Sequence, residues 1–321
     1  MSNNHMVLRD TCPACRSRNA VMLYSCDYCA EPIRSYVDRF YSTQGHADFE
    51  YLKDAAYVLD ECKDCGLVYQ RWVPDEDLCA RVYNEWIDPA RILDVRMKSD
   101  RAKASLAYAE ELLGIINRLK SGSNRIRMLD FGMGWGEYCQ VAQALGCKAC
   151  GVEVSQERID HARSQGIEVM SQDELPESEF DYIVCDQVLE HVPNPLSVWQ
   201  TFSKCLREGG IAKIGVPDGK GVAAQVRSRG FHWEAPDWRI PGQSGDNPVS
   251  PLEHINCFDV TSLVALAESF GFQRLDMPLR SQYVCVPALD VRAVVIRYLK
   301  MAKRRFLAST NLFFERRGGP S

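Results

Sequence analysis

The sequence lacks any long uninterrupted apolar segment, which excludes a protein that spans a membrane by helices. No apolar run in its 321 residues approaches the ~20 residues that such a helix needs. The first residues contain no basic stretch followed by an apolar one, so no signal peptide is expected. Internal repeats and low-complexity segments are also lacking. With 46% hydrophobic and 25% charged residues, we expect a folded, cytoplasmic protein.

An excess of positive charge is lacking too. The chain has 38 Lys and Arg against 43 Asp and Glu, a formal net charge of -5. This balance argues against a general nucleic-acid binder, because such proteins present basic surfaces. We therefore expect no nucleic-acid partner.

Cysteine, by contrast, is abundant, with 14 residues. Without an export signal, a disulfide framework is not expected. Eight cysteines stand among apolar neighbours and are interpreted as small buried hydrophobic residues. The other six form three Cys-x-x-Cys pairs near the N-terminus: Cys12/Cys15, Cys26/Cys29 and Cys62/Cys65.

The outer two pairs predict a structural zinc site. A thiolate pair at this spacing clasps one metal ion from a tight turn, and two pairs complete a tetrahedral site. We favour Cys12, Cys15, Cys62 and Cys65 as ligands, because Cys65 runs through Gly66 directly into a strand. The middle pair remains an alternative, because Cys12, Cys15, Cys26 and Cys29 would also make a short-spaced site, and participation of all six cysteines is left open. Since 46 residues separate the outer pairs, a loop or helix must intervene.

Periodicity predicts how the chain is organised. Residues 1–74 show little helical periodicity and form the zinc-binding module, and 75–124 form a helical linker or lid. From 125 to 321, strands alternate with helices, which is typical of an α/β domain with a parallel sheet and helices on both faces. Its expected strands are 127–131, 149–154, 168–170, 180–186, 211–216, 272–279 and 311–315. The expected helices are about 98–120, 137–145, 195–206, 261–270 and 290–306.

The segment MLDFGMGWG, residues 128–136, is the most informative motif. Glycine stands at every second position, Gly132, Gly134 and Gly136, after an apolar strand and Asp130. Glycine has no Cβ and tolerates positive φ, so such a loop lets the backbone approach a nucleotide-like ligand. The spacing differs from the Gly-x-Gly-x-x-Gly of dinucleotide binders, and Asp130 would repel a phosphate. An acid there favours a cationic ligand such as S-adenosylmethionine, which has no phosphate.

A second acid supports a ribose-containing ligand. Glu153 follows Gly132 by 21 positions, at the end of the next strand, where a carboxylate can accept hydrogen bonds from both ribose hydroxyls. The alternative is a solvated residue at a helix start, before the N-cap candidate Ser155.

Taken together, four motifs resemble the class I S-adenosylmethionine-dependent methyltransferases. They are LDFGMGWG (129–136), GVE (151–153), DYIVCDQVLEHV (181–192) and LREGG (206–210), in the order and spacing of that family. The resemblance implies a Rossmann-like, seven-stranded sheet. It also implies a cofactor site made by Asp130, Gly132, Gly134, Gly136, Glu153, Asp173, Asp186 and Gln187.

The resemblance extends to the cysteines, because some sugar-modifying methyltransferases carry an N-terminal zinc-binding module that ends in Cys-x-x-Cys-Gly-Leu. We therefore expect a sugar acceptor, in a nucleotide-sugar or surface-polysaccharide pathway, methylated at oxygen or carbon. A natural-product or quinone methyltransferase is the alternative. A scaffold that binds the cofactor without chemistry is an alternative of another class.

A general base is needed if the acceptor is a hydroxyl or a carbon acid. Histidine suits this role near neutral pH, and His254 and His191 are the candidates. His254 lies in an expected acceptor-binding insert at about 217–258, and Glu253 beside it either orients that histidine or acts as base. His191 follows the fourth strand and is equally consistent with a structural role.

The expected C-terminal helix, 290–306, carries six basic residues among apolar ones. Such a helix can lie on an anionic membrane surface, which leaves a lipid-linked substrate open. The commoner arrangement, a basic face exposed on a helix that packs against the sheet, is favoured.

Overall fold

The computed structural model of the chain describes residues 5–43, 45–87, 101–119, 125–237, 247–276 and 310–318. The chain divides into two compact units, each with its own sheet and core. The predicted C-terminal helix at 290–306, and Trp238 in the predicted insert, lie outside the described residues. No helix among those that are described is long and apolar enough to cross a membrane.

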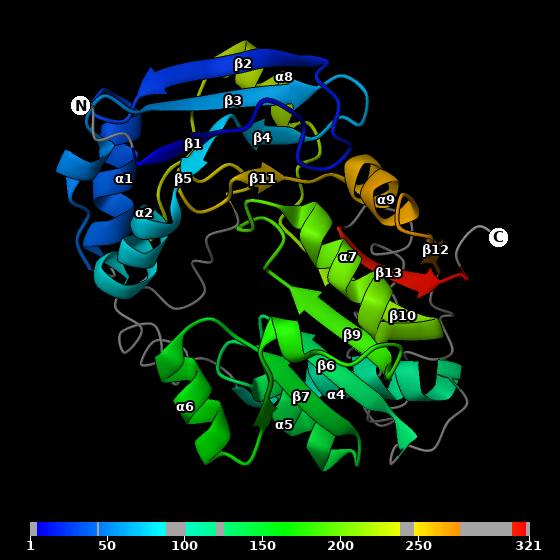
Figure 1. Cartoon of the computed structure of the whole chain (residues 1–321). Helices are drawn as coiled ribbons and strands as arrows, with labels where there is room; N and C mark the ends of the chain where they lie inside the picture. Colours follow the sequence, from blue (N-terminus) through cyan, green and yellow to red (C-terminus); the bar gives the residue numbers. More distant parts are fainter. Residues whose placement is uncertain are drawn as a thin grey trace, which may run out of the picture. The chain divides into compact units, whose positions relative to one another are not determined.

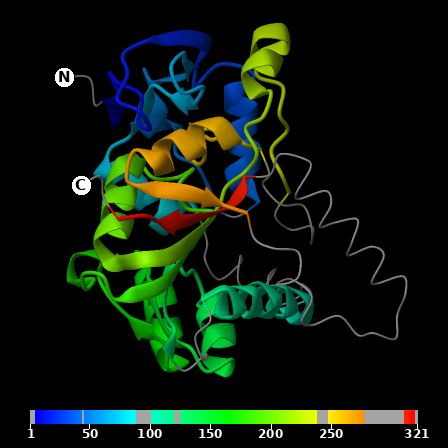
Figure 2. The same ribbon diagram turned by 90° about the vertical axis from the view of Figure 1, so that its right-hand side faces the viewer.

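The second unit comprises Ala102–Val188, Ser197–Val216 and Leu266–Ser321 and contains the predicted α/β fold (Figure 1). Its seven strands lie in the order β12-β13-β10-β9-β6-β7-β8. The five strands from β10 to β8 are parallel, whereas β13 pairs antiparallel with both β10 and β12. Figure 2 shows this edge, with β12 in orange beside β13 in red. The strands are β6 (Arg127–Phe131), β7 (Lys148–Val152), β8 (Glu168–Val169), β9 (Phe180–Asp186), β10 (Leu206–Gly215), β12 (Phe272–Leu275) and β13 (Asn311–Arg316).

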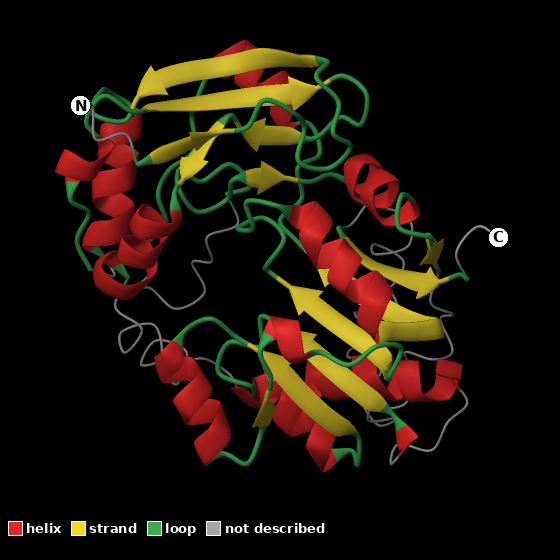
Figure 3. Cartoon of the chain, viewed as in Figure 1, coloured by secondary structure: helices red, strands yellow, loops and turns green. Residues whose placement is uncertain are grey.

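Helices cover both faces of this sheet, because side chains alternate along each strand (Figure 3). On one face, Met128 of β6 belongs to a core cluster with Leu112 of α4. On the other, Phe131 of β6 packs edge-on against Phe202 of α7, with ring centroids 5.2 Å apart. The helices are α4 (Arg101–Leu119), α5 (Glu137–Ala144), α6 (Gln156–Ser164), α7 (Pro195–Cys205) and α9 (Val260–Glu268), of which α4, α7 and α9 begin in the first unit.

The predicted elements of this unit that fall on described residues are confirmed, with one difference at the fifth strand. This strand was expected at 211–216, but β10 begins at Leu206. The pairing of β10 with β9 shifts register between Leu206 and Ile211. Gly209, with a φ of 72°, lies in this irregular stretch. The glycine pair therefore makes a β-bulge inside a strand, since glycine tolerates the positive φ that the extra residues require.

The first unit comprises Met1–Arg101, Leu189–Leu196 and Pro217–Ala265. Its main sheet has four antiparallel strands in the order β11-β4-β3-β2, and β1 pairs with β5 in a second, two-stranded sheet. Its strands are β1 (Met6–Leu8), β2 (Ala20–Asp27), β3 (Ala56–Cys62), β4 (Val68–Gln70), β5 (Trp72–Pro74) and β11 (Asn256–Cys257). Its helices are α1 (Ile33–Ser42), α2 (Glu76–Arg81), a π-helical turn (Val82–Trp86) and α8 (Val222–Arg229).

The prediction of little helical periodicity in residues 1–74 is wrong. Helix α1 lies between the outer cysteine pairs, and it buries Ile33, Tyr36, Val37, Phe40 and Tyr41. These positions repeat at intervals of three and four residues, which is the pattern of an amphipathic helix. Two tyrosines among them weaken the apolar signal, yet both rings are buried in the core.

The described residues of the predicted insert at 217–258 pack with the N-terminal residues. Val226, Phe231 and Leu252 belong to the same core cluster as Tyr36 and Tyr57. Phe231 packs edge-on against Tyr36, with ring centroids 5.2 Å apart. The first unit is thus assembled from segments that are far apart in the sequence.

Candidate functional site

The glycine loop follows β6 and turns sharply into α5. Gly132, Gly134 and Gly136 all have positive φ, of 78°, 56° and 78°. A Cβ on Gly132 would lie 2.4 Å from Val188 Cγ2, and one on Gly136 would lie 2.4 Å from Ile167 Cδ1. Both the backbone conformation and the close packing therefore require glycine at these positions.

Glu153 is held in place by backbone donors. Its Oε2 accepts a hydrogen bond from the Gly134 N–H at 2.9 Å. Its Oε1 accepts from the N–H groups of Val154 and Ser155, at 2.9 and 3.0 Å. The side chain is 5% exposed, and Arg158 lies 3.8 Å from Oε2. A solvated residue at a helix start is therefore excluded. The fixed carboxylate ties the loop to the end of β7 and retains lone pairs for a ligand.

Asp130 is buried on the face of β6 that also carries Met128, beneath the loop. The Cys139 thiol lies 3.8 Å from its Oδ2, as a hydrogen-bond donor. Burial, and then the nearby Asp186 carboxylate, raise the pKa of Asp130 to about 7, although Lys213 opposes the shift. A carboxyl with this pKa gains its charge most readily when a cation lies beside it.

Lys213 provides a buried positive charge on β10. Its Nζ lies 2.9 Å from Asp186 Oδ2 and 3.7 Å from Glu111 Oε2. Burial opposes this charge, but the two carboxylates outweigh it and raise the pKa of Lys213. The hydroxyls of Tyr138 and Tyr182 donate to Glu111 at 2.7 and 3.0 Å. Lys213 therefore stays charged and fixes Asp186 at the end of β9.

Asp173 and Gln187 complete the predicted cofactor residues. Asp173 is exposed on a short 3₁₀-helix, Gln172–Glu174, which follows β8. Gln187 follows β9 with a φ of 57°, and its N–H donates to the Gly215 carbonyl at 2.8 Å. Both lie after the carboxyl ends of parallel strands, which is where ligands bind in open α/β sheets.

In the first unit, the four outer cysteines come together. The Sγ atoms of Cys12 and Cys65 are 3.6 Å apart, and those of Cys15 and Cys62 are 3.5 Å apart. All four Sγ atoms lie within 4.8 Å of one another. The middle pair does not join them: Cys29 is exposed, and the Cys26 thiol contacts backbone carbonyls of residues 27–31.

The two cysteine turns have the same backbone form. The N–H of Arg16 donates to the Cys12 carbonyl, and the N–H of Gly66 donates to the Cys62 carbonyl, both at 2.9 Å. Arg16 and Gly66 occupy equivalent left-handed positions, with φ of 62° and 81°. Asp64 joins the turns, since it accepts from the side chains of Ser17 and Asn19.

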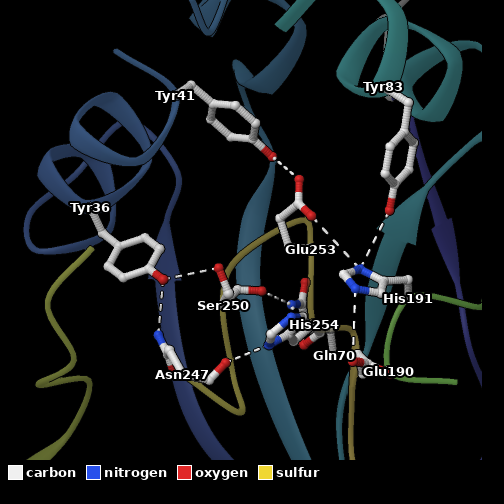
Figure 4. A network of polar contacts seen from close by, with 10 residues as sticks. All are labelled: Tyr36, Tyr41, Gln70, Tyr83, Glu190, His191, Asn247, Ser250, Glu253 and His254. Atoms are coloured by element: carbon white, nitrogen blue, oxygen red, sulfur yellow. Dashed lines mark hydrogen bonds and ion pairs between the residues drawn. The ribbon is translucent and has the colours of Figure 1, made fainter. Parts of the chain in front are cut away.

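A polar network fills another part of the first unit (Figure 4). Glu253 accepts a hydrogen bond from the Tyr41 hydroxyl at 3.0 Å, and its other oxygen lies 3.7 Å from His191 Nδ1. The Tyr83 hydroxyl also lies 3.4 Å from His191 Nδ1, and Glu190 lies 3.9 Å from Nε2 of the same ring. Glu253 therefore contacts His191, which comes from a distant part of the sequence.

His254 is buried and packs edge-on against His191, with ring centroids 4.8 Å apart. Its Nδ1 contacts the Asn247 carbonyl, so that nitrogen carries a hydrogen, and in the neutral ring Nε2 then has the lone pair. Asn247 is itself fixed, because its amide donates to the Tyr36 hydroxyl at 3.0 Å. His254 thus presents a basic nitrogen in a fixed orientation.

Comparison with known proteins identifies the family of the chain. A family model described as a methyltransferase domain matches residues 101–276, more than half of the chain. The chain belongs to the methyltransferase-domain family. This confirms the predicted resemblance to class I S-adenosylmethionine-dependent methyltransferases, and it agrees with the predicted α/β fold.

Curated relatives of this methyltransferase domain match only in part. The ubiquinone biosynthesis O-methyltransferase of Glaesserella parasuis is 30% identical over 117 residues, which is 32% of this chain and 50% of the relative. That of Aeromonas salmonicida is 30% identical over 95 residues, 26% of this chain and 40% of the relative. The chain thus spans half or less of the length of these relatives.

Solved methyltransferase structures overlap at low identity. An S-adenosylmethionine-dependent methyltransferase from Mesorhizobium loti is 16% identical, with a TM-score of 0.40, over 62% of this chain and 94% of that one. The plantazolicin methyltransferase in complex with SAH is 12% identical, with a TM-score of 0.43, over 74% of this chain and 91% of that one. The family assignment rests on the match over residues 101–276.

Several polar residues around the methyltransferase domain's motifs were not anticipated. Lys213 is the one charged residue of the apolar segment 211–215 in β10, which is a signal that sequence alone offers. Glu190 lies within the DYIVCDQVLEHV motif, but the sequence predicted no role for it. The tyrosines and amides of the first-unit network gave no local signal, because their partners are far away in the sequence: Tyr36, Tyr41, Gln70, Tyr83, Asn247 and Ser250.

Proposed function

We propose that the protein transfers a methyl group from S-adenosylmethionine to a small-molecule acceptor. The observation that carries this proposal is the glycine loop tied to the buried Glu153 carboxylate through the Gly134 N–H. Glu153 would accept hydrogen bonds from the ribose, and Asp130 would face the positive charges of the cofactor. The cofactor supplies a methyl carbon activated by its positive sulfur.

The chain's own part in the reaction is to orient the acceptor and take its proton. We assign proton removal to His254, because its Nδ1 is held by the Asn247 carbonyl and its Nε2 keeps a lone pair. His191 and Glu253 are positioning residues in this proposal. The chain runs directly from Gln187, a predicted cofactor residue, into Glu190 and His191.

Cofactor binding is the first test. Isothermal titration with S-adenosylmethionine should detect binding to the wild-type protein. A Glu153→Gln variant should bind about 10- to 100-fold more weakly, since it loses charge-assisted hydrogen bonds. Glu157→Gln, an exposed substitution on the neighbouring helix α6, is the matched control. No binding to the wild type would overturn the enzyme assignment in favour of the scaffold alternative.

The proposed base is tested by turnover. His254→Ala should abolish methyl transfer and leave S-adenosylmethionine affinity intact. His46→Ala, at an exposed histidine of the same unit, should leave both turnover and affinity unchanged. Retained turnover in His254→Ala would exclude this residue as base.

We propose a sugar acceptor first, from the likeness of the cysteine module to that of sugar-modifying methyltransferases. A quinone precursor is the second candidate, because ubiquinone biosynthesis O-methyltransferases are among the relatives. Nucleotide sugars, glycans and phenolic quinone precursors should be incubated with enzyme and cofactor, and products analysed by mass spectrometry for an added methyl group. Methylation of phenols alone would exclude the sugar.

We also propose one structural zinc ion at Cys12, Cys15, Cys62 and Cys65. Tetrahedral zinc has Zn–S bonds of about 2.3 Å, which places sulfur atoms about 3.8 Å apart. The measured Sγ separations of 3.5 and 3.6 Å fit this arrangement. Elemental analysis should find about one tightly bound zinc per chain, and Cys62→Ser should lose it, whereas Cys26→Ser should not. A metal-free wild type would exclude the site.

A further inference from the structure

Glu190, His191 and His254 form a second group of metal-ligating side chains in the first unit. One carboxylate oxygen and one ring nitrogen from each histidine lie within 4.8 Å of one another. Glu190 and His254 are buried, and His191 is half-buried. The group shares no residue with the four cysteines.

The atoms around both histidines match the surroundings of metal-bound imidazoles. A histidine that binds a metal through one nitrogen donates its other N–H to a carboxylate or backbone carbonyl. Here Glu253 lies 3.7 Å from His191 Nδ1, and the Asn247 carbonyl contacts His254 Nδ1. The Nδ1 atoms of both rings thus face oxygen atoms that can accept their hydrogens, and His191 Nε2 lies 3.9 Å from Glu190 Oε1.

Two further contacts fix these outer partners. The Tyr41 hydroxyl donates to Glu253 at 3.0 Å, and the Asn247 side chain donates to the Tyr36 hydroxyl at 3.0 Å. Side chains held in this way cannot turn freely, so ligand atoms stay close without an ion. Such preorganisation reduces the entropy that ion binding would otherwise cost.

The donor set selects the kind of ion. Two imidazoles and one carboxylate suit Zn²⁺ and similar transition ions, whereas Mg²⁺ and Ca²⁺ prefer oxygen ligands alone. Bonds of 2.0–2.2 Å to zinc place tetrahedral ligand atoms about 3.4 Å apart. The three ligand atoms lie within 4.8 Å of one another, so a shortening of at most about 1.4 Å brings each pair to this separation.

We propose that Glu190, His191 and His254 bind a divalent transition-metal ion, with zinc as the physiological candidate. Its functional consequence rests on the proposed function. The His254 Nε2 lone pair accepts either a proton or the ion, but not both. Occupation of this site therefore removes the base, and zinc inhibits methyl transfer until a chelator withdraws it.

Cobalt(II) is the probe that separates the two metal sites. Full-length protein is dialysed against metal-free buffer, its remaining zinc is measured, and Co²⁺ is then added. A further equivalent should bind with visible d–d absorption but without thiolate-to-cobalt charge transfer, because imidazole and carboxylate are its ligands. Charge-transfer absorption that accounts for all bound cobalt would place it on cysteine and overturn the proposal.

Variants assign that further equivalent to residues. His191→Ala and Glu190→Gln should each weaken Co²⁺ binding at least about tenfold, because each removes one of three ligands. His46→Ala should bind like the wild type, and thermal denaturation of all variants checks that they are folded. Undiminished binding in both ligand variants would overturn the site.

The functional arm uses turnover. Zn²⁺ should inhibit the wild type, and EDTA should restore activity. Inhibition should need at least about tenfold more Zn²⁺ in Glu190→Gln, which retains the base. Equal inhibition of both proteins would overturn the competition. The cobalt titration needs no acceptor, so a protein that binds Co²⁺ as expected but methylates nothing would contradict the proposed function and leave the site standing.

Discussion

The glycine loop of the second unit and the polar network of the first unit differ in the length of chain that builds them. In the loop, the hydrogen bond from the Gly134 N–H to Glu153 joins residues 19 positions apart. In the network, the bond between the Tyr36 and Ser250 hydroxyls joins residues 214 positions apart. The loop is made mainly by backbone groups, and the network mainly by side chains.

This difference has an energetic counterpart. A site made by backbone depends on the conformation of a few glycines, so a single added methyl group disturbs it. A site made by side chains spreads its stability over several hydrogen bonds, each of which contributes about 0.5–1.5 kcal/mol, or more where a charged group takes part. We therefore expect the largest effects of single substitutions in the loop.

Gly132→Ala should have the largest effect. Its Cβ would lie 2.4 Å from Val188 Cγ2, at a φ of 78°. Left-handed strain and overpacking together should lower the free energy of unfolding by about 3 kcal/mol. Gly166→Ala is the control, with a φ of 75° and no atom within 4 Å, and should cost only about 1 kcal/mol. Urea denaturation measures both, and equal costs would show that packing against Val188 is unimportant.

The next largest effect concerns pH. The pKa of Asp130 is about 7 in the folded protein, because of burial and the Asp186 charge, against about 3.9 in an unfolded chain. Between these two pKa values the folded state binds more protons than the unfolded chain does. The free energy of unfolding therefore falls as pH rises. From pH 5 to pH 8 the wild type should lose about 2–3 kcal/mol through this group.

Asp130→Asn should remove this part of the pH dependence, whereas Asp160→Asn, at an exposed position on α6, should keep it. Urea denaturation at pH 5 and pH 8 in the absence of cofactor makes the comparison. An unchanged pH dependence in Asp130→Asn would mean that another group is responsible.

The smallest effect is expected in the network. Tyr41→Phe removes the hydroxyl that donates to the Glu253 carboxylate at 3.0 Å and should cost about 1.5–2 kcal/mol. Tyr28→Phe is the matched control: the ring is equally buried, but its hydroxyl lies 3.5 Å from the Gln70 amide oxygen. Tyr28→Phe should lower the free energy of unfolding by less than about 1 kcal/mol. Similar costs would contradict the idea that the network depends on bonds to charged groups.

Much of the second unit could be predicted because its information is local. Alternating strands and helices, glycines with positive φ and the acid after β7 all leave a signal within a few dozen residues. Lys213 is an exception that an apolar strand with one lysine could have revealed. Lys213 holds Asp186 in place, although it lies outside the four sequence motifs.

The first unit was harder to predict, because its interacting residues are far apart in the sequence and come together only on folding. The Cys-x-x-Cys spacing gave three candidate pairs, and the strand that follows Cys65 favoured Cys12, Cys15, Cys62 and Cys65, which the structure brings together. Helix α1 was missed because tyrosines stand at two of its buried positions. The contact of Glu253 with His191 depends on the direction in which each side chain leaves the backbone.

The place of β13 in the sheet has a consequence for synthesis on the ribosome. This strand is the last of the described strands in chain order, yet it pairs with both β10 and β12. Until residues 311–316 have emerged, β10 has one edge without a partner strand. An unpaired edge of this kind can bind another nascent chain or a chaperone. Translation past β13 therefore closes the sheet and ends that period of exposure.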